Sequence, residues 1–331
     1  MISRVPRVVV LSLGGTIATA SRGDQGALPR VTPNEILETL PGIEDIARVS
    51  SQPVRQVMSS ALSMGDLFDV VDASRSAIEQ GADGIVITTG TDTLEEVAFA
   101  LDQLWALAAP LVVTGSMRSA DQPGADGAAN LADAIVVAST PATVGLGALV
   151  VMNAEVHAAR FVQKTHTSNP AAVRSPLAGP IGVVQERKLR MLTAPTGRPP
   201  SKFHRPGRST PVALIRCGLD DDGRLLGAVM GLGYRGLVVE ALGGGAVPPS
   251  WVDPLDCLVH TIPVILSSRV PSGEVLHETY DAVGCEKDLI ARGLIPSGLL
   301  DGTKSRILLT LSLQADPSLS EIRRIFENPY L

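Results

Sequence analysis

The stretch 84–96, GIVITTGTDTLEE, is the feature that most constrains how this chain can fold. It opens with a β-branched apolar run, 84–87, that is too short for a helix, and it passes into hydroxyl groups and one carboxylate over 88–93. Apolar residues then recur at helical spacing from Leu94 to Leu104. The stretch therefore predicts a buried strand that ends in polar side chains and leads into an amphipathic helix.

Thr91 and Asp92 follow the end of this predicted strand. In an open parallel sheet, ligands bind in the crevice beyond the carboxyl ends of the strands, so both side chains stand where chemistry would be done. Thr and Asp are also ordinary helix N-caps, and capping is the alternative interpretation of a single polar strand end.

Two further predicted strands end in the same way, which favours a shared site over capping. The strand 8–13 runs into Gly14-Gly15-Thr16, where the double glycine permits a sharp turn or a close approach to a ligand. The strand 54–58 ends at Ser59 and Ser60. The polar, glycine-containing segment 20–32 that follows Thr16 is expected to be a mobile loop and a candidate lid.

Strands and helices alternate through the first half of the chain. Further strands are expected at 111–114 and 147–152, and helices at 34–40, 65–80, 94–104 and 124–138. This alternation is typical of a doubly wound α/β domain with a mainly parallel sheet.

A change in composition marks the expected domain boundary. Five prolines lie among Gly, Ser and basic residues between 194 and 211, which predicts an extended linker between domains 1–193 and 212–331. The second domain has expected strands at 212–216, 236–240 and 263–267 and helices at 224–232 and 320–326. We expect it to be a smaller α/β domain.

The overall charge and the cysteines exclude several classes of protein. A net charge of −6 gives no electrostatic footprint for nucleic acid or an anionic membrane, and no apolar run is long enough to span a bilayer. The first residues show no secretory signal, so a cytoplasmic protein is expected. Three cysteines without a CxxC pair, and five histidines without ligand spacing, predict neither a metal site nor another cofactor.

Two motifs together carry a resemblance to a known family. Residues 13–18, LGGTIA, and 87–96, ITTGTDTLEE, resemble the paired signatures of the bacterial-type L-asparaginase/glutaminase family. The likeness continues in order through GSMR at 115–118, ADG at 125–127, KT at 164–165 and SSRVPSG at 267–273. It thus covers nearly the whole chain.

The resemblance implies hydrolysis of L-asparagine to L-aspartate and ammonia through an acyl-threonine intermediate, with room for a glutaminase side activity. A threonine hydroxyl needs a neighbouring base to become a nucleophile. By motif position, Thr16 would be the nucleophile of the first step. Thr91, Asp92 and Lys164 would form a second threonine with its Asp–Lys relay.

The same resemblance implies how the small zwitterionic substrate would be bound. Ser59, with its neighbour Ser60, would hold the α-carboxylate, and Asp92 would pair with the α-ammonium group. Gly15 and Gly90 would line the site, and backbone amides near Thr91 would form the oxyanion hole. Members of the family assemble with sites that a neighbouring subunit completes, so a homodimer or homotetramer is expected.

The chain departs from the family pattern in the candidate lid. Relatives usually carry a lid tyrosine that contacts the nucleophile, whereas this chain has no Tyr between Thr16 and Pro33, and Ala27 or Leu28 occupies its neighbourhood. We expect Tyr280 of a partner subunit, or a water molecule, to assist Thr16. In addition, Thr89 stands where many relatives have a histidine.

Two alternative functions stay open. The first is the amidase subunit of a tRNA-dependent amidotransferase, which normally has an additional domain before the Gly-Gly-Thr strand; here that strand starts at about Val5. The second is a non-catalytic amino-acid sensor, which the missing lid tyrosine favours. The retained threonines and lysine argue against a pure binder, which has no need of a relay.

Overall fold

The computed structural model describes residues 4–22, 25–29, 33–38, 40–193, 203–205 and 210–328. The chain forms two compact units, Met1–Lys202 and Phe203–Leu331. The expected linker 194–211 lies mostly outside the described residues, so the domain boundaries at 193 and 212 stay a prediction.

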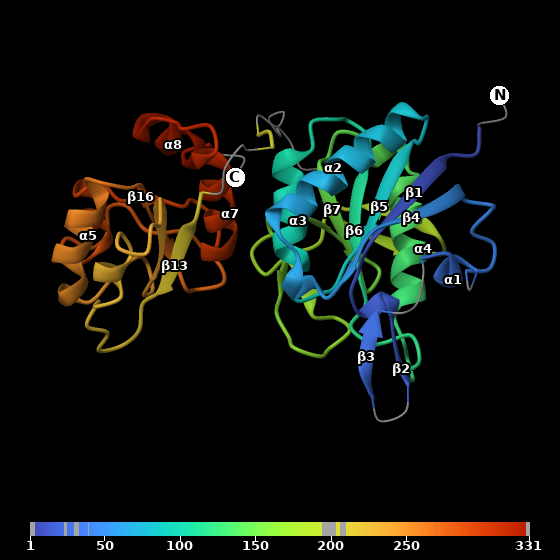
Figure 1. Ribbon diagram of the computed structural model, residues 1–331, viewed down its shortest axis with the longest axis horizontal. Coiled ribbons are helices and arrows are strands. Elements are labelled where there is room, and N and C mark those ends of the chain that lie inside the picture. Colours follow the sequence, from blue (N-terminus) through green and yellow to red (C-terminus); the bar gives the residue numbers. More distant parts are fainter. Residues whose placement is uncertain are drawn as a thin grey trace. The chain divides into compact units, whose positions relative to one another are not determined.

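Unit 1 is built on an eight-stranded sheet of order β12-β11-β8-β7-β6-β5-β1-β4 (Figure 1). Five neighbouring strands run parallel: β4 (Arg48–Val57), β1 (Arg7–Gly14), β5 (Gly84–Thr88), β6 (Leu111–Thr114) and β7 (Ala148–Met152). Three more pair antiparallel at one edge: β8 (Glu155–Ala158), β11 (Gly182–Gln185) and β12 (Lys188–Met191). The predicted parallel α/β sheet is confirmed.

Helices cover both faces of this sheet. Helices α2 (Met64–Glu79) and α3 (Leu94–Leu104) lie beside each other on one face, whereas α4 (Gly127–Ala138) packs on the other (Figure 1). The five residues of β5 are all buried, because a parallel strand between two helical layers has no solvent face. The short helix α1 (Pro33–Leu37) precedes the edge strand β4.

Strand β4 is longer than the predicted strand 54–58. It spans ten residues, Arg48–Val57, at the edge of the sheet, with many positions exposed. An edge strand shows little apolar alternation, so its polar first half, RVSSQP, gave no strand signal.

The expectation of a loop over the segment 20–32 is wrong for its described residues. They form an antiparallel hairpin of β2 (Thr19–Arg22) and β3 (Gln25–Pro29), in which Thr19 pairs with Pro29. The hairpin projects from the end of unit 1 where β1 ends (Figure 1). A two-stranded ribbon outside the main sheet is specified by backbone pairing rather than by apolar alternation, so composition did not reveal it.

Unit 2 contains a four-stranded parallel sheet of order β13-β14-β15-β16. Its strands are β13 (Val212–Arg216), β14 (Gly236–Ala241), β15 (Val264–Ser268) and β16 (Ile295–Pro296). Its helices are α5 (Val252–Val259), α6 (Glu286–Ala291), α7 (Gly302–Leu313) and α8 (Leu319–Phe326). The expected smaller C-terminal α/β domain is therefore confirmed.

One predicted helix of unit 2 is wrong. Residues 224–232 form only a single 3-10 turn, Leu226–Ala228. Gly227 and Gly231 lie inside the predicted helix, and each glycine raises the entropic cost of helix formation there.

The helices of both units fall short of a membrane span. Within the described ranges, no helix combines the length and the apolar character that crossing a bilayer requires.

His157 is a fully buried histidine in strand β8. Its Nδ1 lies 3.0 Å from Oγ of Ser175, and its Nε2 lies 3.4 Å from a carboxylate oxygen of Glu155. Burial lowers the pKa of His157 to about 4, because the sheet interior penalises the charged ring. The imidazole is therefore neutral in the folded protein at pH 7.

This burial predicts a stability change on the acid side. The unfolded chain takes up a proton at His157 below pH 6.5, whereas the folded chain does not until about pH 4, so stability is lost as the pH falls through this window. We expect the wild type to lose about 3 kcal/mol more between pH 7 and pH 4 than His157→Gln does. Denaturant unfolding at several pH values measures the difference.

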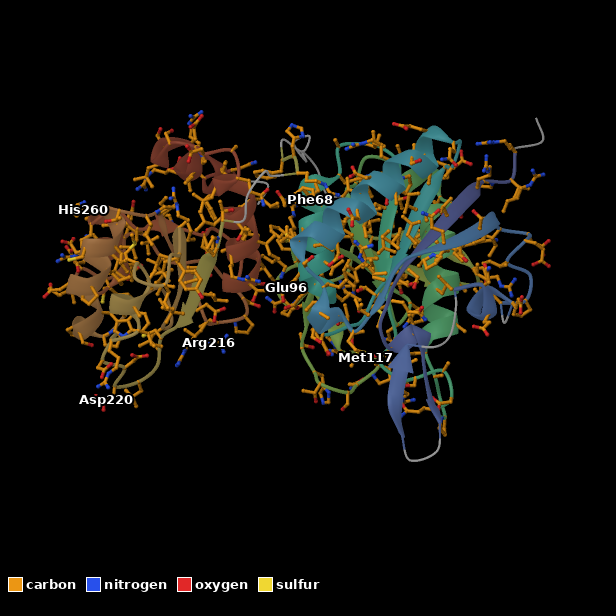
Figure 2. All side chains as sticks on the ribbon, viewed as in Figure 1. Phe68, Glu96, Met117, Arg216, Asp220 and His260 are labelled. Carbon is orange, nitrogen blue, oxygen red and sulfur yellow. The ribbon has the colours of Figure 1, made fainter. Side chains whose placement is uncertain are left out.

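His260→Gln is the matched control for this prediction. His260 is exposed just after α5 and is labelled in Figure 2. Its replacement should leave the pH dependence of the wild type unchanged. Parallel stability curves for His157→Gln and the wild type would contradict the prediction.

Candidate active site

Two glycines bring the ends of strands β1 and β5 into backbone contact. Gly15 has φ +82°, and a Cβ on it would lie 2.1 Å from the backbone nitrogen of Gly90 and 2.3 Å from its Cα. A Cβ on Gly90 would in turn lie 2.7 Å from Oγ of Ser59. No side chain fits at either position. The segments that follow β1, β5 and β4 therefore converge at one point.

Thr16 stands directly after this contact, at the start of the 3-10 turn Thr16–Ala18. The turn is fixed on both sides: the backbone N–H of Gly15 donates to the carbonyl of Val57 at 3.2 Å, and Thr19 closes the turn onto the carbonyl of Thr16. Thr16 itself is partly exposed. Hydrogen bonds therefore fix the backbone on both sides of Thr16, and the residue stays partly accessible to solvent.

Thr91 follows β5 and is only 5% exposed. Nζ of Lys164 donates to Oγ1 of Thr91 at 3.0 Å and to Oδ1 of Asp92 at 2.7 Å. The lysine side chain is 16% exposed, whereas the Asp92 side chain is 65% exposed. The three side chains that the sequence predicted as a relay therefore form one hydrogen-bonded group.

A small separate sheet delivers Lys164 to this group. Lys164 ends strand β9 (Gln163–Lys164), which pairs antiparallel with β10 (Val173–Arg174). The backbone N–H of Lys164 donates to the carboxylate of Glu95 in the first turn of α3. The sequence did not reveal this role of Glu95, because nothing in its spacing points to a partner 69 residues away.

The two predicted substrate-binding serines occupy one 3-10 turn, Ser59–Ala61, after β4. Ser59 is buried beside Gly90, and its carbonyl accepts a hydrogen bond from Oγ1 of Thr93 at 3.1 Å. Ser60 lies at the surface of the same turn. The structure therefore brings Ser59 to the glycine contact, while Ser60 is exposed next to it.

The loop 115–126 packs against the same site. The carboxylate of Asp126 accepts backbone N–H groups from Met117 at 3.0 Å and from Arg118 at 2.9 Å. A Cβ on Gly115 would lie 3.3 Å from a methyl carbon of Thr91. Figure 2 shows Met117 at the end of unit 1 from which the hairpin projects. The sequence marked this loop only through the family likeness.

Tyr280 lies in unit 2 and is 57% exposed. Its backbone N–H and that of Thr279 donate to one oxygen of Glu286, at 2.6 and 3.1 Å. Glu286 is only 1% exposed, in the first turn of α6. The sequence missed Glu286, whose buried carboxylate holds the loop that presents the tyrosine.

Thr89, the other departure from the family pattern, is fully buried. Among the described residues, its hydroxyl has no hydrogen-bond partner.

The arrangement suits nucleophilic chemistry without a cluster of metal ligands. Thr16, a partly exposed residue on a fixed turn, and Thr91, whose hydroxyl contacts an amine, each directly follow one of the two glycines in contact. Such a pair supplies a nucleophile and a proton-transfer group for acyl transfer. In the described part of the chain, no group of three or more His, Cys, Asp or Glu residues is placed to hold a metal ion.

Sequence comparison finds two matching families. The family described as "Asparaginase, N-terminal" matches residues 7–197. The family described as "Glutaminase/Asparaginase C-terminal domain" matches residues 211–326. Together these matches extend over most of the chain, and the predicted resemblance is confirmed.

Individual relatives agree with this result. The chain is similar to an L-asparaginase of Bacillus licheniformis, with 31% identity over 93% of this chain and 95% of the relative. It is also similar to a glutamyl-tRNA(Gln) amidotransferase subunit of Methanosarcina barkeri, with 31% identity over 90% of this chain and 71% of the relative. The crystal structure of a probable cytoplasmic L-asparaginase from Campylobacter jejuni superposes with a TM-score of 0.87 at 27% identity, covering 97% and 99% of the two chains.

The glycine contact predicts that Gly15→Ala is strongly destabilising. A methyl group would meet the backbone of Gly90 and would also impose strain at φ +82°. We expect a loss of at least about 3 kcal/mol of unfolding free energy, measured by denaturant titration.

Gly145→Ala separates the two causes. Gly145 has φ +81°, and a Cβ on it would meet nothing within 4 Å, so its replacement should cost only about 1 kcal/mol. Equal losses in the two variants would show that backbone strain alone, and not the contact with Gly90, constrains Gly15.

Proposed function

This chain belongs to the asparaginase family, and from that premise we propose that it hydrolyses L-asparagine to L-aspartate and ammonia through an acyl-threonine intermediate. The contact of Lys164 Nζ with both Thr91 Oγ1 and Asp92 Oδ1 is the observation that carries this proposal. It places an amine at hydrogen-bonding distance from a hydroxyl group, which proton transfer requires and binding alone does not.

In the first step, Oγ1 of Thr16 attacks the carbonyl carbon of the substrate side-chain amide. A C–O bond forms, and the resulting oxyanion is stabilised by backbone N–H groups near Thr91. Collapse of this intermediate breaks the C–N bond, and the hydroxyl proton of Thr16 leaves on the departing ammonia. The product of this step is an acyl ester on Thr16.

In the second step, water attacks this ester and releases L-aspartate. Thr91 and Lys164 serve this step as a proton relay: the hydroxyl–amine pair, joined by the 3.0 Å contact, takes up a proton from the attacking water. Asp92 holds the lysine side chain at 2.7 Å. The proton then returns to Oγ1 of Thr16 as the ester bond breaks, so the enzyme is regenerated.

Both charges of the substrate have candidate partners on unit 1. The exposed carboxylate of Asp92 would pair with the α-ammonium group, and the Ser59 turn, with Ser60, would bind the α-carboxylate. Gly15 and Gly90 would line the site with their backbones, which their close contact holds in place. The same groups would accept L-glutamine, which differs by one methylene, so a side activity on glutamine belongs to the proposal.

The proposal also includes an oligomer and a cytoplasmic location. A homodimer or homotetramer would bring Tyr280 of a partner subunit to Thr16, with Glu286 holding the tyrosine loop. The alternative assistant of Thr16 is a water molecule. A cytoplasmic location follows by analogy with the relative from Campylobacter jejuni.

An amidotransferase subunit is the second candidate function, because such a subunit is 31% identical over 90% of this chain. An amino-acid sensor is the third, favoured by the absence of a tyrosine between Thr16 and Pro33. Free turnover of L-asparagine by the purified chain separates the asparaginase from both. Binding of L-asparagine by calorimetry without ammonia release would favour the sensor.

The central test is ammonia release from L-asparagine, L-glutamine and D-asparagine. Thr16→Ala removes the nucleophile, and Thr91→Val or Lys164→Met removes the relay, so we expect kcat to fall by at least about 1,000-fold in each. Thr143→Val, which changes a buried threonine outside the site, should keep wild-type turnover. Normal turnover in Thr16→Ala would contradict the acyl-threonine mechanism.

Tyr280→Phe tests the assistant of Thr16. If the tyrosine hydroxyl of a partner subunit takes part in proton transfer, kcat should fall by about 100-fold, the lower range for general acid–base catalysis. The fold of unit 2 should be unchanged, because the loop is held through its backbone. Wild-type turnover in Tyr280→Phe would assign the role to water instead.

A further inference from the structure

Thr19, the first residue of the hairpin β2–β3, binds the carbonyl oxygen of Thr16 twice. Its backbone N–H donates to this oxygen at the end of the 3-10 turn. Its hydroxyl donates to the same oxygen at 2.8 Å. A carbonyl oxygen has two lone pairs, and Thr19 occupies both. Thr19 is only 2% exposed, so the donors of these bonds are shielded from water.

A second hydroxyl stands behind the first. Oγ of Ser119 lies 3.0 Å from Oγ1 of Thr19, and Ser119 is 5% exposed. The Thr19 hydroxyl is the donor in this contact, as it is in the contact with Thr16, so its one proton is held between the carbonyl oxygen of Thr16 and Oγ of Ser119. Ser119 thus holds the Thr19 side chain from the far side. We call these three groups, Oγ of Ser119, Oγ1 of Thr19 and the carbonyl oxygen of Thr16, the hydroxyl chain.

The far end of the hydroxyl chain rests on a fixed loop. Ser119 directly follows Met117 and Arg118, whose backbone N–H groups are held by the carboxylate of Asp126. The N–H of Ala120 also donates to the carbonyl of Thr19 at 3.4 Å. The turn that carries Thr16 is therefore tied to the loop 115–126 by side chains and backbone together.

We propose that Thr19 and Ser119 are positioning residues that hold the backbone of Thr16 so that its hydroxyl meets the substrate amide. This inference rests on the proposed function of Thr16 as nucleophile. The contacts that link these residues to Thr16 end on its carbonyl oxygen rather than on its hydroxyl, so both residues act through the backbone. A misplacement of about 1 Å in a reacting group can cost on the order of 100-fold in rate, so the effect appears in kcat.

The test compares four variants with the wild type: Thr19→Val, Thr19→Ser, Ser119→Ala and the double variant Thr19→Val/Ser119→Ala. Thr19→Val should lower kcat for L-asparagine by about 10- to 100-fold, with KM within about twofold of the wild type. Thr19→Ser keeps the hydroxyl and should restore kcat to within about threefold. Ser119→Ala should cost about fivefold and should add nothing in the double variant, because Ser119 acts through Thr19.

Thr143→Val is the matched control, because Thr143 makes the same contact elsewhere. Its hydroxyl is fully buried and donates to the carbonyl of Thr140, three residues earlier, at 2.7 Å. Thr143 lies in the segment between α4 and β7, at the opposite end of the strands from Thr16. We expect this variant to lower Tm as Thr19→Val does while leaving kcat unchanged.

The possible failures can be told apart. An active wild type with unchanged kcat in Thr19→Val, or an equal loss of kcat in Thr143→Val, would overturn the positioning role. Losses in Thr19→Val and Ser119→Ala that multiply in the double variant would overturn the hydroxyl chain. A wild type without any turnover of L-asparagine would remove the proposed function first, and this inference with it.

Discussion

The contact between the backbones of Gly15 and Gly90 is the constraint on which the site depends. A Cβ on Gly15 would lie 2.1 Å from the nitrogen of Gly90, so the segments after β1 and β5 can meet only because Gly15 has no side chain, and the missing side chain of Gly90 leaves room for Ser59. Thr16 and Thr91 each follow one of these glycines. The backbone positions of the two threonines are therefore set by this packing.

The charged residues of the site, Asp92 and Lys164, come from segments that lie far apart in the sequence. Lys164 comes from a two-stranded sheet outside the main one, yet its Nζ reaches Oγ1 of Thr91 at 3.0 Å. Two carboxylates make this placement definite: Asp92 binds the amine and Glu95 binds the backbone N–H. Glu95 belongs to α3, the helix that starts just after Thr91, so one element positions both the hydroxyl and its amine.

The sequence predicted those parts of the fold and the site that a short continuous run of residues specifies. Strand 111–114 and the polar ends of β1 and β5 were found because buried parallel strands are short apolar runs. The hairpin β2–β3 and the bonds from Thr19 to Ser119 and from Lys164 to Glu95 were not found. They depend on backbone pairing or on single hydrogen bonds between distant residues, and no periodicity or composition records such pairings. Lys164 was found because lysines are few in this chain and this one lies in a polar stretch shortly after the predicted strand 147–152; the family likeness implied the same role.

In unit 1, the second step of the proposed reaction has a candidate proton-transfer group, whereas the first step has none among the described contacts. Thr91 has an amine at hydrogen-bonding distance, whereas among the described residues the hydroxyl of Thr16 has no such partner. The described contacts around Thr16 go to its backbone, so they fix its position and supply no acceptor for its proton. A weak nucleophile needs that acceptor at the moment of attack. On the proposed mechanism, the proton acceptor for the first step would come from outside these contacts. Tyr280 of a partner subunit and a water molecule are the two candidates for it, so the first step, unlike the second, would depend on a group that the described part of unit 1 does not supply.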